Sequence, residues 1–202
     1  MLSCLEILPV TTTIATRKPQ RRKRWTYADY CKIPRDRKRH EIIDGRHYVT
    51  PSPELFHQAI SKRLLFQLMD AIEGPELGLV FCAPLDLHLG RGTVVQPDLI
   101  VVAAGTEEIL GDKKLTGVPD MVVEILSPST RGHDRRRKKQ RYERAGIREF
   151  WIVDPETRQI EQFVLHNGRY GVPKVATRRL RLEVLPGVGI DLASLFAPPM
   201  ER

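Results

Sequence analysis

Two acidic residues lie in segments of the sequence that are otherwise apolar. Glu124 falls within residues 121–126, and Asp98 falls within residues 94–102, which are rich in β-branched side chains. A carboxylate in a buried strand is costly unless it is paired with a cation or bound to a metal. If the two strands are neighbours, the carboxylates converge and would repel each other without a cation. Two hard oxygen donors with room for water are typical of a Mg²⁺ site.

Each of these residues also has an ordinary structural interpretation. Glu124 either binds a metal or forms a structural salt bridge with one of the many arginines. Asp98 follows Pro97, which indicates an edge strand, a bulge or a plain turn between two shorter strands. Glu41 is either a third metal ligand or an exposed strand residue. His57 is either structural or a proton-transfer group beside the metal.

Basic residues are concentrated in two segments of the chain, residues 1–50 and residues 131–144. The 202 residues include 33 Lys and Arg against 25 Asp and Glu, for a net charge of +8. Concentrated basic patches favour an anionic partner, and nucleic acid is the first candidate. The tail that begins the first segment, residues 1–24, is either a binding arm or a solvated arm without function. Phosphate contacts are expected from Arg22, Lys23 and Arg24 in the first segment and from Arg131, Arg135, Arg136 and Lys139 in the second.

Hydrophobic periodicity predicts the elements that position these residues. Residues 41–49 predict a hairpin whose Asp-Gly pair forms a primed turn. Residues 25–40 are polar and compatible with a helix. Helices are predicted over 53–73 and 131–145, and strands over 79–89, 93–102, 119–126, 149–154, 159–165, 169–176 and 179–185. This order indicates an α/β or α+β domain with a mixed sheet and helices on its faces.

The order of the motifs resembles the PD-(D/E)XK nuclease superfamily, and more closely its Uma-type branch. The match depends on Pro97-Asp98, on residues 119–130 around Glu124 and on residues 150–155, and it extends over about residues 25–197. The resemblance implies a restriction-endonuclease-like mixed sheet with the order αβββαβ, an N-terminal hairpin and a C-terminal β-meander. It also implies hydrolysis of DNA phosphodiester bonds, with Mg²⁺ or Mn²⁺ as cofactor and double-stranded DNA as partner.

One departure from the superfamily pattern concerns its lysine. The pattern places Lys two residues after the acidic residue, where this chain has Leu126. The chain resembles the Uma-type branch, in which the lysine lies on the following helix. This resemblance implies that the lysine is Lys138 rather than its neighbour Lys139. The catalytic residues implied are Asp98, Glu124 and Lys138. The missing lysine keeps open an alternative, a nucleic-acid-binding module with the same fold and no catalysis.

Other features restrict the class of protein. Three scattered cysteines without a CxxC pair exclude a disulfide framework and argue against a zinc knuckle. The chain has no apolar run of about 18 residues, and the basic run follows the mildly apolar residues 1–16 instead of preceding them. Neither a membrane span nor a signal peptide is therefore expected, and a cytoplasmic location is. Aromatic residues make up only 6%, too few to favour an RNA-binding stacking platform.

The expected domain organisation is simple. Residues 1–24 are expected to form a disordered basic tail, and residues 25–202 a single domain. One metal site cuts one strand, so cutting both strands of a duplex calls for two copies of the chain. We expect a two-fold homodimer formed with the strands of the C-terminal meander. The alternative is that these strands only cover one face of the sheet.

Overall fold

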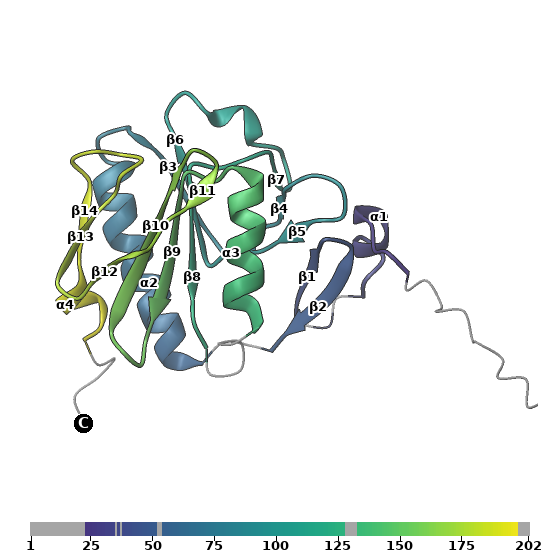
Figure 1. Ribbon diagram of the computed structural model, residues 1–202, viewed down its shortest axis with the longest axis horizontal. Helices are drawn as coiled ribbons and strands as arrows, with labels where there is room; N and C mark the ends of the chain where they lie inside the picture. The colour runs from purple at the N-terminus through teal and green to yellow at the C-terminus, as the bar shows by residue number, and fades with distance from the viewer. Residues whose placement is uncertain (1–22, 35, 37, 52–53, 128–132, 198–202) are drawn as a thin grey trace, which may run out of the picture.

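A seven-stranded mixed β-sheet with a long helix on each face forms the centre of the computed structural model (Figure 1). The structure describes residues 23–34, 36, 38–51, 54–127 and 133–197. The sheet order is β11 (Arg169–Tyr170), β10 (Gln159–His166), β9 (Glu149–Asp154), β8 (Met121–Ile125), β6 (Leu99–Ala103) and β3 (Gly78–Cys82), with β12 (Lys174–Ala176) paired to β10. The helices are α2 (Leu55–Ile72) and α3 (His133–Ala145). Strands β8 and β9 are parallel, so α3 is the connection that crosses between them.

A second sheet of five short strands lies beside α3 in Figure 1. Its order is β2 (Arg46–Thr50), β1 (Arg39–Ile43), β5 (Val94–Val95), β4 (Leu87–His88) and β7 (Leu115–Thr116). The remaining elements are α1 (Tyr27–Tyr30), the 3-10 helix η1 (Glu107–Ile109), the paired strands β13 (Arg179–Arg181) and β14 (Gly189–Asp191), and α4 (Leu192–Leu195). No helix in these described ranges is long and apolar enough to cross a membrane.

Side chains that alternate along β8 point into two separate parts of the hydrophobic core. Met121, Val123 and Ile125 pack in one cluster with the buried face of α2, whereas Val122 packs in another with α3 and the small sheet. This strand is therefore buried on both faces. Because side chains alternate along a strand, Glu124 shares the face of Val122 and points toward α3 and the small sheet.

The predicted N-terminal hairpin is confirmed. Strands β1 and β2 pair in antiparallel register with Ile43 opposite Arg46. The two turn residues, Asp44 and Gly45, have φ values of +51° and +76°. Positive φ at both positions is what a primed turn requires, and an Asp-Gly pair meets that requirement with little strain.

Two of the predicted strands are each divided between the two sheets. Residues 79–89 form β3 of the large sheet and β4 of the small one, and residues 93–102 form β5 and β6. A proline lies near each crossing point, Pro84 in the first segment and Pro97 in the second, and proline cannot donate a hydrogen bond to a strand ladder. The prediction of single strands was wrong here. Asp98 precedes β6, as the interpretation of a turn between two shorter strands requires.

The N-terminal segment and the C-terminal meander also differ from expectation. Among the described residues of 25–40 only α1 is helical, and residues 179–185 contain only the three-residue strand β13. Leu180 and Leu182 are buried in the cluster beneath α2, whereas Val172 is 97% exposed. The meander therefore covers part of the sheet, as in the alternative interpretation, and the homodimer stays a prediction. Most of the expected tail, residues 1–22, lies outside the described residues.

Candidate active site

The two carboxylates that stand out in the sequence lie side by side in the structure. Strands β6 and β8 are antiparallel with Leu99 opposite Val123, which places Asp98 beside Glu124 at the same end of the sheet. Oδ2 of Asp98 accepts a 2.7 Å hydrogen bond from the backbone N–H of Ile125. The register of β6 and β8 therefore places the two carboxylates beside each other.

A buried lysine of α3 joins the carboxylates into one cluster. Nζ of Lys138 lies 3.0 Å from both carboxylate oxygens of Glu124 and 2.9 Å from Oε1 of Glu41. One helical turn later, the hydroxyl of Tyr142 donates a 2.5 Å hydrogen bond to Glu124. Lys138 and Tyr142 are four residues apart and so lie on the same side of α3. The same side of α3 therefore supplies both groups that contact Glu124 from this helix.

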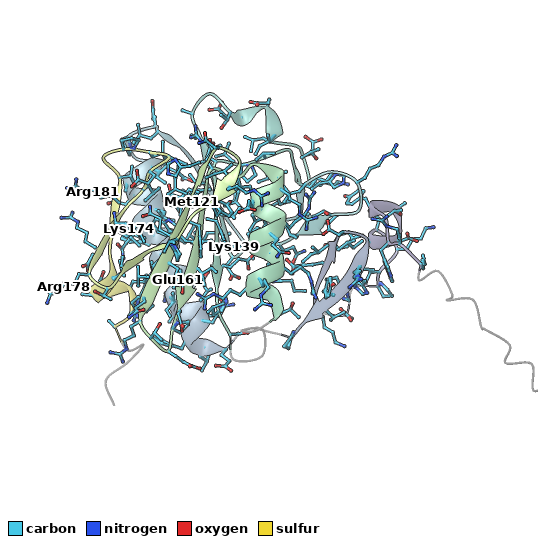
Figure 2. All side chains as sticks on the ribbon, viewed as in Figure 1. Met121, Lys139, Glu161, Lys174, Arg178 and Arg181 are labelled. Carbon is cyan, nitrogen blue, oxygen red and sulfur yellow. The ribbon has the colours of Figure 1, made fainter. Side chains whose placement is uncertain are left out.

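The rival lysine points elsewhere. Nζ of Lys139 lies 4.2 Å from the centroid of the Phe163 ring on β10. Figure 2 labels Lys139 on α3, in front of the large sheet. Lys138 is buried, whereas Lys139 is half-buried. The structure therefore separates two adjacent lysines that spacing alone left equivalent.

Glu41 reaches the cluster from the small sheet. Its Oε1 accepts a 2.8 Å hydrogen bond from the backbone N–H of Gln96, which lies where the chain crosses between the sheets. The side-chain amide of Gln96 donates to Asp86 at 2.8 Å and to the hydroxyl of Tyr30 at 3.0 Å. Glu41 is buried, so the exposed-strand interpretation of this residue was wrong. These hydrogen bonds hold Gln96 in place, two residues before Asp98.

Two further basic groups face Asp98. Nη1 of Arg39 lies 2.9 Å from Oδ1 of Asp98, and Nε2 of His57 lies 3.4 Å from Oδ2. Arg39 is not among the residues predicted from the sequence. A signal for it exists in the pattern, because Arg39 and Glu41 are two residues apart on β1 and so project from the same face. His57 is buried near the start of α2 and contacts Asp98, as a group beside the metal would.

The surroundings drive the pKa values of the two carboxylates apart. Burial raises the pKa of Asp98, but the hydrogen bond from His57 and the charge of Arg39 outweigh it and lower this pKa to about 2. Burial raises the pKa of Glu124 to about 7, and the negative charges of Asp98 and Glu41 add to the rise although Lys138 opposes it. Titratable groups with pKa values displaced in opposite directions are typical of functional sites.

Lys138 stays protonated in this environment. Burial lowers its pKa, but the neighbouring charges of Glu124 and Glu41 are stronger and raise it above the ordinary value for lysine. The ammonium group is therefore a permanent positive charge and not a base. Glu41, Asp98 and Glu124 supply three carboxylates to the cluster, against the two cations Lys138 and Arg39.

The donor set fits a hard divalent cation. Asp98 and Glu124 offer carboxylate oxygens at the same end of neighbouring strands, and their side chains are 3% and 12% exposed. Within the part of the chain that the structure describes, no three or more His, Cys, Asp or Glu side chains form a preformed metal cage. Mg²⁺ does not need such a cage, since it is commonly bound by one or two carboxylates together with waters and substrate phosphates.

The expected phosphate-binding residues have different environments. Arg136 is exposed, Arg135 contacts Glu161 of β10, and Lys139 lies over Phe163. Nζ of Lys23 lies 2.8 Å from Asp29, so this lysine is paired within the N-terminal segment, and Arg24 packs against the turn of the hairpin. Arg22 and Arg131 lie outside the described residues. Of the described α3 residues in this set, Arg136 is thus the exposed one.

The raised pKa of Glu124 predicts a pH-dependent stability in metal-free buffer. Between pH 4.5, its ordinary pKa, and about pH 7, the folded protein holds a proton that the unfolded chain has released. Glu124 therefore stabilises the folded state below pH 4.5, and this stabilisation is lost as the pH rises through 7. The shift corresponds to at most about 3 kcal/mol.

The measurement compares urea unfolding of the wild type and Glu124→Gln in EDTA between pH 5 and pH 8. The wild type should lose stability relative to the variant across this range. Because all other titrating groups are shared by the two proteins, their contributions cancel in the difference. Parallel profiles would show that Glu124 ionises normally.

Comparisons with known proteins define the class of this fold. A crystal structure of a protein from Anabaena variabilis, described as a "putative nuclease belonging to DUF820", superimposes with a TM-score of 0.72. The match covers 85% of this chain and 97% of that one, with 17% sequence identity, and so shows a shared mixed α/β fold. The profile of the family "Uma2: Putative restriction endonuclease" matches residues 27–193. The chain therefore belongs to the Uma2 family, which confirms the resemblance noted in the sequence. The comparison with curated proteins gave no match.

Proposed function

We propose that this protein is a metal-dependent endonuclease that hydrolyses DNA phosphodiester bonds. The observation that carries the proposal is the convergence of Glu41, Asp98 and Glu124 on Lys138, from strands of both sheets and a helix. Three carboxylates buried together repel one another when all are ionised, and a bound divalent cation would reduce that repulsion. Membership of the Uma2 family supports a nucleic-acid substrate.

The arrangement of elements supports a restriction-endonuclease-like core. When the strands of the small sheet are left out, the first six elements of the large sheet and its two covering helices follow one another as α2, β3, β6, β8, α3 and β9. This is the order αβββαβ. The acidic residues lie at β6 and β8, and the lysine lies on α3, where the displaced lysine of the family is expected.

Each residue of the cluster has a distinct role in the proposed reaction. Asp98 and Glu124 would hold Mg²⁺ or Mn²⁺, with Glu41 as a further carboxylate beside them. When bound, the ion supplies a water of lowered pKa and neutralises charge on the scissile phosphate. Lys138 holds a permanent positive charge where it stabilises the additional negative charge of the transition state. Arg39 and His57 keep Asp98 ionised and oriented.

One observation favours a second candidate function. Both oxygens of Glu124 are occupied by Lys138, and position 126 holds Leu126 in place of the superfamily lysine. A binding module that keeps the fold without catalysis would have the same ion pair as a structural feature. The two candidates differ in whether the protein turns over DNA.

Incubation of supercoiled plasmid and of single-stranded DNA with the purified protein tests the proposal. In Mg²⁺ or Mn²⁺ the proposed enzyme produces nicked or linear plasmid, and EDTA abolishes the reaction. A homodimer on double-stranded DNA produces linear product directly, whereas a monomer accumulates nicked circles. Binding of the plasmid without any cleavage in either metal would favour the binding module.

Phosphate contacts from α3 predict a change in the salt dependence of DNA binding. Each phosphate contact that is lost lowers the slope of log affinity against log salt concentration by about 1. Arg136→Ala should reduce the slope by about this amount for any DNA sequence. Arg178→Ala is the matched control, because Arg178 is also exposed but lies at the far edge of the molecule (Figure 2). Equal slopes for Arg136→Ala and the wild type would remove α3 from the DNA interface.

A further inference from the structure

The two cations of the carboxylate cluster differ in how much of their hydrogen-bonding capacity they use. The ammonium group of Lys138 contacts as many carboxylate oxygens of Glu124 and Glu41 as it has N–H donors, at 2.9 Å and 3.0 Å. The guanidinium group of Arg39 has more donors, but among the described residues only its Nη1 makes a contact, with Oδ1 of Asp98 at 2.9 Å. Arg39 therefore has donors left for a further anion.

The unused donors of Arg39 form one edge of its planar guanidinium group. Nε and Nη2 donate to no residue that the structure describes, and neither nitrogen is buried away from solvent. These two nitrogens present parallel N–H bonds, the arrangement through which arginine binds a phosphate or a carboxylate with two hydrogen bonds. Asp98 thus occupies one nitrogen and leaves this edge complete.

Arg39 lies at the exposed side of the cluster. Arg39 and Glu41 project from the same face of β1, in the small sheet that lies beside α3 (Figure 1). Along this face the exposed fraction of the side chain rises from 2% for Glu41 to 20% for Arg39. Asp98, Glu124 and Lys138 are all less exposed than Arg39. The free edge of the guanidinium group is therefore accessible to an anion from solvent.

The anion that the proposed reaction brings to this place is a phosphate of DNA. The phosphate that is cleaved must come close to Asp98, a proposed metal ligand, and Arg39 is in contact with Asp98. The permanent charge and planar fork of arginine match the geometry of a phosphate. We propose that Nε and Nη2 of Arg39 bind the phosphate that is cleaved. This assignment rests on the proposed function and gives Arg39 a second role besides keeping Asp98 ionised.

Arg39→Gln and a matched control, Arg148→Gln, test the phosphate contact. Arg148 also pairs with a buried aspartate, Asp120, at 2.9 Å. Asp120 precedes β8 whereas Glu124 lies near the end of that strand, so this pair is at the opposite end of the sheet. Both substitutions remove one positive charge and one ion pair to a buried aspartate. Urea unfolding verifies that each variant is folded.

Binding of a short DNA duplex is measured in EDTA over a series of salt concentrations. Arg39→Gln should lower the slope of log affinity against log salt concentration by about 1, as expected when one phosphate contact is lost. Arg148→Gln should leave the slope unchanged. The affinity for Mn²⁺ without DNA, measured by calorimetry at pH 8, should be retained in Arg39→Gln because the substitution removes no proposed metal ligand. The two measurements separate a contact with DNA from an effect through Asp98 alone.

The kinetics of cleavage in Mg²⁺ identify which phosphate is bound. A contact with the cleaved phosphate that strengthens in the transition state predicts a lower kcat for Arg39→Gln at saturating DNA, whereas a contact with a distant phosphate only raises KM. Arg39→Lys keeps a cation beside Asp98 but lacks the planar fork. Its kcat should fall about tenfold, the effect of losing one hydrogen bond to a charged group. This variant tests the proposal even if Arg39→Gln fails to fold.

The outcomes separate this contact from the proposed function. An unchanged salt slope in folded Arg39→Gln, a change in KM alone, or an unchanged kcat in Arg39→Lys overturns the assignment. Loss of Mn²⁺ binding with an unchanged slope overturns it too, since Arg39 then acts only through Asp98. A wild type that binds DNA but cleaves it in neither metal overturns the endonuclease proposal and the assignment to the cleaved phosphate, whereas the salt slope still decides whether Arg39 binds DNA.

Discussion

Asp98→Asn should reduce the rate of Mg²⁺-dependent DNA cleavage by about a thousandfold or more, because a metal ion contributes several kcal/mol to stabilising the transition state. The substitution removes one of the two carboxylates proposed to hold the ion. It also leaves Arg39 and the backbone N–H of Ile125 facing a neutral amide. The rate is measured as initial plasmid cleavage at saturating Mg²⁺.

Asp120→Asn is the matched control for this substitution. Asp120 is also a buried aspartate that precedes a strand of the large sheet, and it accepts hydrogen bonds from Ala103 and Thr106 and pairs with Arg148. Its loss should lower stability and leave cleavage by the folded protein close to the wild-type rate. If Asp98→Asn cleaves as fast as Asp120→Asn, Asp98 does not hold a catalytic metal.

The second large effect is expected at Lys138. Lys138→Met leaves Glu41 and Glu124 buried without their common cation, which costs about 3–5 kcal/mol of folding stability when a buried ion pair is broken from one side. The same variant should lose cleavage activity, because no other lysine lies within reach of Glu124 among the described residues. Stability is measured by urea unfolding at pH 8, where the loss is largest because Glu124 is ionised.

Lys139→Met provides the comparison for this variant. It removes the neighbouring lysine of α3, whose contact is with the Phe163 ring, and should change stability by less than about 1 kcal/mol. Cleavage should continue. A larger loss of activity in Lys139→Met than in Lys138→Met would reverse the assignment of the lysine.

The candidate site was partly predictable from the sequence because it violates local patterns. Glu124 interrupts an apolar strand, and the pattern of β8 alone fixed the face on which it lies. The primed turn at Asp44-Gly45 was predictable for the same reason, since few residue pairs tolerate two positive φ values. In both places the local sequence has a single physical solution.

The crossing of the chain between the two sheets was not predictable from such patterns. Residues 93–102 have the periodicity of one strand, but β5 pairs with β1 and β6 pairs with β3 and β8. Which partner a short strand chooses depends on contacts distant in sequence. Arg39 was missed for this reason, because only the pairing of β1 with β5 brings it to Asp98. The position of Glu41 beside Lys138 follows from the same crossing.

The location of bound Mn²⁺ in a crystal of the wild type tests the central claim most directly, because the anomalous signal of manganese identifies the ion without reference to activity. The proposed mechanism predicts a peak in contact with carboxylate oxygens of both Asp98 and Glu124. The same peak should be absent from crystals of Asp98→Asn prepared in parallel. A manganese ion bound elsewhere in a protein that cleaves plasmid, with these two carboxylates still bound only to groups of the protein, would contradict the account.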